Sequence, residues 1–230
     1  MADLQTVEKR FLKAQSDSKS GDKKKIAYAA LMEKVYKGLG EGKKFIDMDF
    51  NEEEKEELND LHLLTSKPFL YIANVHENNI ANTNLDEYLA KLELSNQERL
   101  VPISAKIEAD LSELEDHEID EFLKEMGVEK PGLHSLIQAA YETLDLQTYF
   151  TAGVKEVRAW TIKKGMTAPQ AAGKIHTDFE EGFIRAEVIG YDDYVEHGGE
   201  TSAKEKGKMR MEGKDYIVSD GDVMHFHFNS

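Results

Sequence analysis

The sequence predicts a mixed fold: a helical hairpin, then an α/β region, then an α+β region. Three observations support this prediction. Apolar residues recur at helical spacing near the N-terminus, apolar strands alternate with helices in the middle, and several strands surround one short helix near the C-terminus. These changes in pattern place the hairpin at residues 1–46, the α/β region at 47–144 and the α+β region at 145–228.

The N-terminal segment is expected to form two antiparallel helices. Leu4, Val7 and Phe11 keep three- and four-residue spacing, the sequence SDSKSGD supplies a turn, and residues 27–39 resume the same period. Each helix carries a single apolar stripe, which is typical of a hairpin rather than of a compact core.

The middle segment alternates helices and strands. Asn51 and Glu54 form a capping box that begins a helix. The strands are continuous apolar runs, which is typical of a parallel sheet buried on both faces. Two strands cannot form such a sheet alone, so we expect this segment to belong to a larger domain and to expose apolar surface over residues 67–146. Strands are predicted at 69–75 and 99–105, and helices at 83–95, 107–127 and 131–145.

The C-terminal segment is rich in strands. Thr167 and Gln170 cap a short helix with Pro169 in its first turn. A mixed sheet around this helix would form a self-contained α+β domain. Strands are predicted at 148–153, 156–164, 183–191 and 216–228, the last with an Asp-Gly turn at 220–221.

The composition is that of a folded protein with unevenly distributed charge. The 230 residues carry a net charge of −16, which divides into +5 over residues 1–46, −18 over 47–146 and −3 over 147–230. The negative total disfavours nonspecific binding to nucleic acid, so an RNA contact would need a local basic face. There is no cysteine, which excludes thiolate metal sites. Without a membrane-length apolar run or a signal-peptide pattern, we expect a soluble cytoplasmic protein.

Two loops that follow the middle strands suggest recognition of a nucleotide base. Asn74-Val75-His76-Glu77 resembles a modified Asn-Lys-x-Asp motif, in which the carboxylate accepts two hydrogen bonds from guanine and the Asn supports the loop. Glu77 moves the carboxylate, whereas the backbone C=O and N–H of Val75 match the donor and acceptor of adenine. The motif therefore favours ATP over GTP. The alternative is that Asn74 merely caps the following loop.

The second loop is Ser104-Ala105-Lys106, a turn that supplies backbone donors beside the base in nucleotide-binding folds of this type. Both loops follow strand carboxyl ends, where open α/β sheets bind ligands. The predicted base-binding residues are Asn74, Val75, Glu77, Ser104, Ala105 and Lys106.

The sequence contains no phosphate-binding pattern GxxxxGK[ST] and no Asp-x-x-Gly, so no catalytic residue or magnesium ligand is predicted. A base pocket alone offers two or three hydrogen bonds at about 1 kcal/mol each. Millimolar binding already needs about 4 kcal/mol. We therefore expect residues 1–230 to bind nucleotide weakly or not at all.

Long motifs relate the chain to a known family. TYFTAGVKEVRAWTIKKGMTAPQAAGKIHTDFEEGFIRAEVI (148–189) and GKDYIVSDGDVMHFHFN (213–229) resemble the C-terminal TGS domain of the YchF-type ATPases, P-loop proteins of the Obg group. The resemblance extends upstream through KPFLYIANVHE (67–77), VPISAKIEADL (101–111) and the N-terminal hairpin.

The family architecture implied by this resemblance is a P-loop domain, a coiled-coil hairpin inserted into it and a ubiquitin-like β-grasp TGS domain. The chain resembles the family from the hairpin onwards, so residues 47–144 would be the C-terminal part of the nucleotide-binding domain. The resemblance implies ATP as the preferred cofactor, with Mg in full-length relatives, and the ribosome as a partner. It assigns adenine contacts to Asn74, Val75 and Glu77 and a supporting role to residues 104–106. His227 departs from a more usual basic residue, which weakens a nucleic-acid role for the last strand.

Two functions stay open from the sequence. The chain is either the C-terminal portion of an ATPase, inert by itself, or a non-enzymatic module that binds ribosome or RNA through the hairpin and the TGS domain. For both the hairpin and the C-terminal basic residues, a solvated charged surface is the plain alternative to an RNA contact. The candidate RNA or ribosome contacts are Arg158, Lys163, Lys164, Lys174, Arg185, Lys204, Lys206, Lys208 and Arg210.

Overall fold

The computed structural model describes residues 1–92, 94, 99–153 and 156–229. The chain divides into two compact units, Met1–Phe69 and Leu70–Ser230, and each is described by itself. No helix in the described part of the chain is long and apolar enough to cross a membrane.

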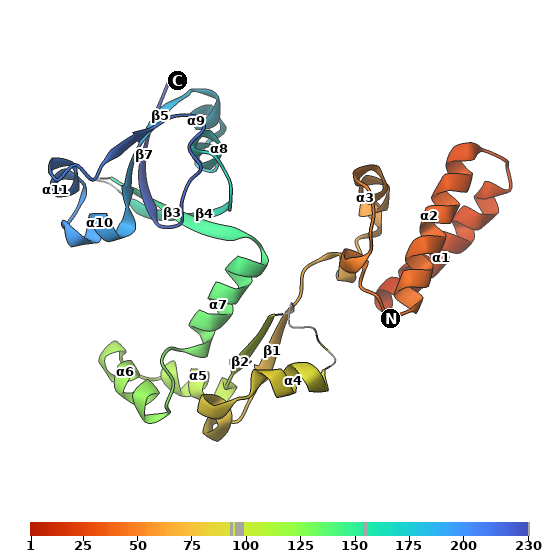
Figure 1. The fold of residues 1–230 in the computed structure, drawn as a ribbon, viewed down its shortest axis with the longest axis horizontal. Coiled ribbons are helices and arrows are strands. Elements are labelled where there is room, and N and C mark those ends of the chain that lie inside the picture. The colour runs from red at the N-terminus through yellow and green to blue at the C-terminus, as the bar shows by residue number, and fades with distance from the viewer. Residues whose placement is uncertain (93, 95–98, 154–155, 230) are drawn as a thin grey trace. The chain divides into compact units, whose positions relative to one another are not determined.

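The first unit is built on two long helices, α1 (Ala2–Ser18) and α2 (Lys23–Gly40), which lie side by side (Figure 1). Their facing side chains Val7, Met32 and Val35 are completely buried. The Asp22 carboxylate caps α2 by accepting the Lys24 N–H at 2.8 Å.

Residues that follow the two helices complete the same core. Phe50, Leu58, Leu61 and Leu63 are buried against the helical pair. This is why the chain divides by contacts after Phe69, later than the change of sequence pattern near residue 46. The elements here are α3 (Glu52–Leu58), which begins at the expected Asn51–Glu54 capping box, and three 3-10 turns, η1 (Phe45–Asp47), η2 (Asn59–Leu61) and η3 (Leu64–Ser66).

The second unit begins with a parallel pair of strands, β1 (Leu70–Asn74) and β2 (Arg99–Ile103). Helix α7 (Gly132–Thr143) contacts β1 and β2, and also the next strand, β3 (Leu146–Ala152). The remaining elements of this part are η4 (Glu77–Asn82), α4 (Leu85–Lys91), α5 (Ala105–Leu111) and α6 (Asp116–Glu125).

The two predicted strands of this part are confirmed, and two helix predictions need comment. The single helix expected over 107–127 is wrong, because α5 ends at Leu111 and a second capping box, formed by Glu115 and Glu118, begins α6. The helix expected over 83–95 is α4, and residues 93 and 95 of that prediction lie outside the described residues.

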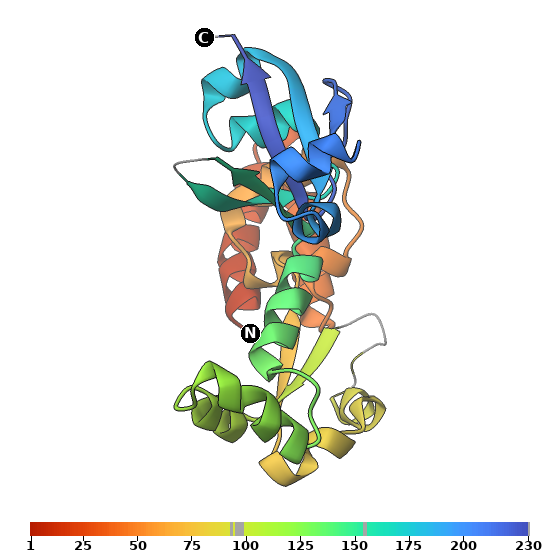
Figure 2. The same cartoon turned by 90° about the vertical axis from the view of Figure 1, so that its left-hand side faces the viewer.

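The C-terminal part is a five-stranded sheet in its described residues, in the order β4-β3-β7-β5-β6. β3 pairs antiparallel with β4 and parallel with β7, and β5 pairs antiparallel with β6 and β7. Figure 2 shows the same elements turned by 90°. The bounds are β4 (Val157–Lys163), α8 (Ala168–Gly173), α9 (Thr177–Glu181), β5 (Phe183–Gly190), α10 (Tyr191–Glu196), α11 (Glu200–Glu205), β6 (Arg210–Glu212) and β7 (Asp222–Phe228).

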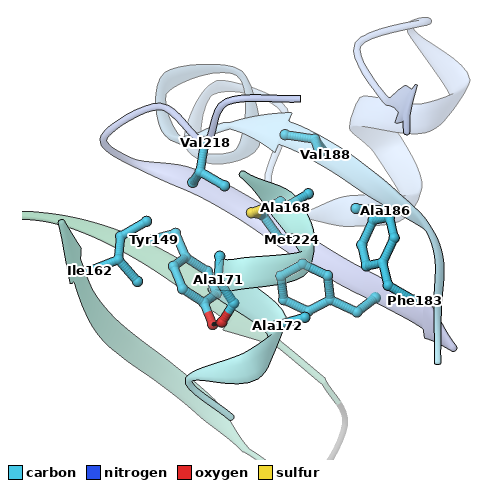
Figure 3. Close-up of a cluster of buried hydrophobic side chains, with 11 residues drawn as sticks. Tyr149, Ile162, Ala168, Ala171, Ala172, Phe183, Ala186, Val188, Val218 and Met224 are labelled. Carbon is cyan, nitrogen blue, oxygen red and sulfur yellow. Dashed lines mark hydrogen bonds between the residues drawn. The ribbon is translucent and has the colours of Figure 1, made fainter. Parts of the chain in front are cut away.

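Helix α8 packs against the buried side chains of this sheet. Ala168, Ala171 and Ala172 of α8 are fully buried against Tyr149 of β3 and its neighbours (Figure 3). The Tyr149 hydroxyl donates to the Ala171 carbonyl at 2.9 Å. The expected cap of Thr167 and Gln170 begins α8.

One prediction about the last strands is wrong, and one strand was not predicted. The sequence predicts a strand at residues 216–218, but there Ile217 makes only an isolated bridge to Thr167, because the Tyr216 hydroxyl and the Ser219 N–H turn back to the Asp222 carboxylate at 2.7 and 2.8 Å. The strand that was not predicted is β6, a three-residue strand that begins at Arg210, the last residue of the basic run 204–210.

Candidate nucleotide-base site

The parallel pairing of β1 and β2 brings the two predicted loops together. Asn74 is the register partner of Ile103, so the residues that follow each strand begin at the same edge of the pair. The six predicted base-binding residues therefore belong to two adjacent loops that are about thirty positions apart in sequence.

Asn74 connects these loops directly. Its Oδ1 accepts the Ala105 N–H at 3.2 Å. The bond also uses one of the backbone donors expected from the Ser104–Lys106 turn.

Val75 is placed differently from the expectation. Its N–H donates to the Ile103 carbonyl at 2.8 Å, and its side chain is buried. In this structure the N–H that was expected to serve as the donor to adenine is therefore used by strand pairing, which continues one residue beyond β1.

Glu77 opens the 3-10 turn η4, next to His76. The carboxylate lies 3.3 Å from His76 Nδ1, and the same nitrogen accepts the Asn78 N–H at 3.4 Å. The Glu77 side chain is partly exposed, so its oxygens can accept hydrogen bonds from a ligand at this loop.

Lys106 is paired within its own helix. Its ammonium forms an i,i+4 ion pair with Asp110, and this hydrogen bond and the attraction of the same carboxylate raise the pKa of Lys106. Glu77 adds a smaller attraction. The lysine thus stays charged beside the loop.

Ser104 is the most buried of the six residues, with 2 % of its surface exposed. Its hydroxyl has no hydrogen-bond partner among the described residues. It lines a cavity of about 360 Å³ together with Ile80, Pro102 and Ile107, whereas the other five predicted residues do not line this cavity.

Glu108 is a structural residue that the sequence prediction missed. Its two carboxylate oxygens accept the N–H groups of Gly132 at 2.7 Å and Leu133 at 3.2 Å, and so cap the start of α7. Glu108 lies on α5, so its carboxylate links α5 to α7. Helix α7 in turn contacts β3. The signal was weak: Pro131-Gly132 begins a helix without a capping side chain of its own.

The predicted basic contacts do not form one cluster of unpaired charges. Arg158 stacks on Trp160 at 4.1 Å, Lys208 pairs with Asp193 at 2.9 Å, and the Arg210 guanidinium donates to the Tyr216 hydroxyl at 3.1 Å. The others are spread over β4, α8, β5 and α11 and the residues that flank them: Lys163, Lys164, Lys174, Arg185, Lys204 and Lys206.

Comparison with known proteins gives the class first: a mixed helix-and-sheet protein with the fold of a YchF structure. The Schizosaccharomyces pombe YchF GTPase structure matches with a TM-score of 0.79 and 34 % identity, over 98 % of this chain and 62 % of that one. A GTP binding protein from Pyrococcus horikoshii OT3 shares the fold, with a TM-score of 0.51, 17 % identity and coverage of 94 % of this chain and 64 % of that one.

Sequence comparisons give the family. A family model named YchF-GTPase_C, described as "Protein of unknown function (DUF933)", matches residues 146–229. "Ribosome-binding ATPase YchF" of Escherichia coli O157:H7 is 51 % identical over 229 residues, and the Bacillus subtilis protein of the same name is 46 % identical over 232. In both cases the match covers 100 % of this chain and 63 % of the relative. The chain is therefore similar to YchF-type proteins along its whole length and spans less than two thirds of theirs, which confirms the resemblance predicted from the motifs.

Proposed function

We propose that this chain is the base-recognition and partner-binding portion of a YchF-type nucleotide-binding ATPase that acts on the ribosome. The proposal rests on the relatives named "Ribosome-binding ATPase YchF", which match along the whole chain. The observation that supports a base site is the contact of Asn74 with Ala105, because it holds together the two loops that such a site needs.

The proposal assigns a role to each part. Residues 1–46 are the coiled-coil hairpin, residues 47–144 the C-terminal part of a G-type nucleotide-binding domain, and residues 145–228 a TGS domain of β-grasp type. The five-stranded sheet around α8 is compatible with a β-grasp.

We propose that the base site prefers ATP to GTP. Guanine offers two donors on one edge, which a short, correctly placed Asp carboxylate accepts, whereas adenine offers one donor and one acceptor. Glu77 is longer than Asp, and the Val75 carbonyl is suited to accept the adenine amine. Since the Val75 N–H is taken by Ile103, the donor to the adenine ring must come from another group.

By itself this chain is proposed not to hydrolyse ATP. Hydrolysis needs groups that hold the phosphates and Mg, and residues 1–230 contain no GxxxxGK[ST] sequence. In full-length relatives those groups would complete the site, with Mg bound beside the phosphates of ATP.

Calorimetry with ATP and GTP in the presence of Mg is the first test. We expect no heat of binding in the micromolar range for either nucleotide. Micromolar ATP binding would contradict the proposal that the phosphate site lies outside these residues.

The base site itself is tested by NMR titration with millimolar adenosine and guanosine. We expect the amide signals of Val75 and Ala105 to shift more with adenosine, and Glu77→Gln to change this preference, while Glu87→Gln on α4 does not. Identical shifts with both nucleosides would exclude a base-selective site.

A second candidate function is a non-enzymatic ribosome- or RNA-binding module. The +5 charge of residues 1–46 favours it, since the remainder of the chain is acidic. Ribosome co-sedimentation that weakens when Lys163 and Lys164 are changed to Glu, but not when Lys55 is changed, would support contact through the C-terminal sheet. Binding that is insensitive to salt and to these changes would exclude an electrostatic contact.

A further inference from the structure

A cluster of three possible metal ligands lies on α10 and at its C-terminal end, outside the predicted base-binding residues. Asp193, Glu196 and His197 each offer one ligand atom, and these atoms all lie within 4.8 Å of one another. No described residue outside this group forms a comparable cluster.

One ring nitrogen of His197 lacks a protein partner. Its Nε2 is buried and has no hydrogen-bond partner among the described residues, although buried polar atoms almost always have one. The backbone holds the residue in place, because the His197 N–H donates to the Asp193 carbonyl at 3.2 Å and the Gly199 N–H to the Tyr194 carbonyl at 2.9 Å. A buried ring nitrogen without a partner is available to coordinate a metal.

The surroundings favour a cation. The C-terminal end of a helix carries partial negative charge, and the two carboxylates add to it. A cation already lies here: the Lys208 ammonium is 2.9 Å from Asp193 Oδ1. A metal ion would therefore compete with Lys208 for Asp193.

We propose that Asp193, Glu196 and His197 form a binding site for a divalent transition metal such as Zn²⁺, with Lys208 as the competing cation. An imidazole with two carboxylates suits Zn²⁺ or Ni²⁺, whereas Mg²⁺ and Ca²⁺ prefer oxygen ligands alone. Three protein ligands leave a coordination position for water. Asp193 also lines an open cavity of about 800 Å³ with Tyr191 and Asp192, which gives the ion access. The proposal does not depend on the proposed nucleotide function.

Calorimetric titration of the full chain with ZnCl₂, in buffer that contains excess Mg²⁺, tests the site. We expect wild type to bind one Zn²⁺ and His197→Gln to weaken binding by roughly tenfold or more. Glu196→Gln should weaken it less. Lys208→Met should strengthen it, because the competing ammonium is removed. Asp192→Asn, on the same helix, and His176→Gln, whose Nδ1 lies 3.4 Å from Asp178, are the controls and should have no effect.

Three results would overturn the proposal. They are the absence of zinc binding to wild type, an unchanged affinity in both His197→Gln and Glu196→Gln, and loss of binding in a His225→Gln/His227→Gln variant. The last result would assign the metal to the neighbouring pair on β7, whose ring centroids are 5.1 Å apart. If circular dichroism shows that His197→Gln does not fold, the exposed Glu196 variant decides.

Discussion

The side chain of Asn74 accepts a hydrogen bond from the backbone of Ala105, at 3.2 Å and across 31 positions of sequence. Strand pairing ends at Asn74 and Ile103, and the Val75 N–H extends it by one bond to Ile103. The side-chain contact joins the loops beyond that point. The two loops therefore form one structural unit before any ligand is present.

We expect Asn74→Ala to loosen this unit. Loss of the hydrogen bond should lower the free energy of unfolding by about 0.5–1.5 kcal/mol and increase amide exchange at Ala105. Hydrogen exchange measured by NMR checks the local effect, and urea unfolding checks the global one.

Asn78→Ala is the matched control for this change, because Asn78 contacts His76 Nδ1 through its backbone N–H, which the substitution keeps. Equal exchange at Ala105 in both variants would contradict the role assigned to Asn74.

Asp3 is expected to stabilise the first unit in a pH-dependent way. Its carboxylate accepts the Leu64 N–H at 2.9 Å and the Thr65 N–H and hydroxyl at 2.7 Å each. Burial alone would raise the pKa of Asp3, but these hydrogen bonds outweigh it and lower the pKa below the ordinary 3.8. The stabilisation is therefore complete above the unfolded-state pKa and is lost as the pH falls through the lower folded-state value.

Asp3→Asn should cost about 1–3 kcal/mol near neutral pH, because an amide cannot accept at both of its polar atoms. Exchange of the Leu64 and Thr65 amides reports the loss, and the difference from wild type should shrink in acid. Asp17→Asn, an exposed position on the same helix, should have little effect. A stability difference between Asp3→Asn and wild type that grows in acid would contradict the lowered pKa of Asp3.

Much of the fold could be predicted from local sequence patterns. The capping boxes at Asn51 and Thr167 were predictable because a cap depends on residues three positions apart. The turn at 216–219 was not, since it depends on Asp222, which accepts from Tyr216 six residues away. Strand β6 was not, since it forms by pairing with β5, where Arg210 is the register partner of Val188.

In the candidate site, too, features set by neighbouring residues were predictable and features set by distant partners were not. The motifs identified both loops, and parallel pairing of their strands brought the loops together. The use of the Val75 N–H by Ile103 and the capping of α7 by Glu108 could not be read from the motifs, because each depends on a partner 24 or more residues away.

Ionisation of Tyr149 is expected to lower the stability of the C-terminal core at alkaline pH. Its hydroxyl is buried and donates to Ala171, and burial raises the pKa of Tyr149. The neutral phenol is thus favoured in the folded state. The stabilisation is complete below the unfolded-state pKa of about 10 and is lost as the pH rises above it.

Tyr149→Phe should lower the free energy of unfolding by about 1–3 kcal/mol, because the Ala171 carbonyl is left without its donor. It should also remove part of the alkaline destabilisation. Trp160 stacks on Tyr149 with ring centroids 6.5 Å apart, so tryptophan fluorescence during urea unfolding reports this core directly.

Tyr141→Phe is the control for Tyr149, since its hydroxyl makes an exposed contact with Thr161 at 3.1 Å. A wild-type protein that loses no more stability above pH 10 than Tyr149→Phe does would contradict the coupling.

Ile72 tests the expectation that the two-stranded sheet exposes apolar surface. It lies in the middle of β1 with 52 % of its surface exposed, while its register partner Val101 on β2 is 7 % exposed. The residues that cover Val101 therefore leave Ile72 exposed. A parallel sheet is normally buried on both faces, so we expect the chain to bind an apolar fluorescent dye and to self-associate at high concentration.

Ile72→Thr should reduce both effects and change stability by no more than about 0.5 kcal/mol. Ile184→Thr, at a position 48 % exposed in β5, is the matched control. A monodisperse monomer without dye binding, or equal effects of the two substitutions, would show that β1 carries no special apolar surface.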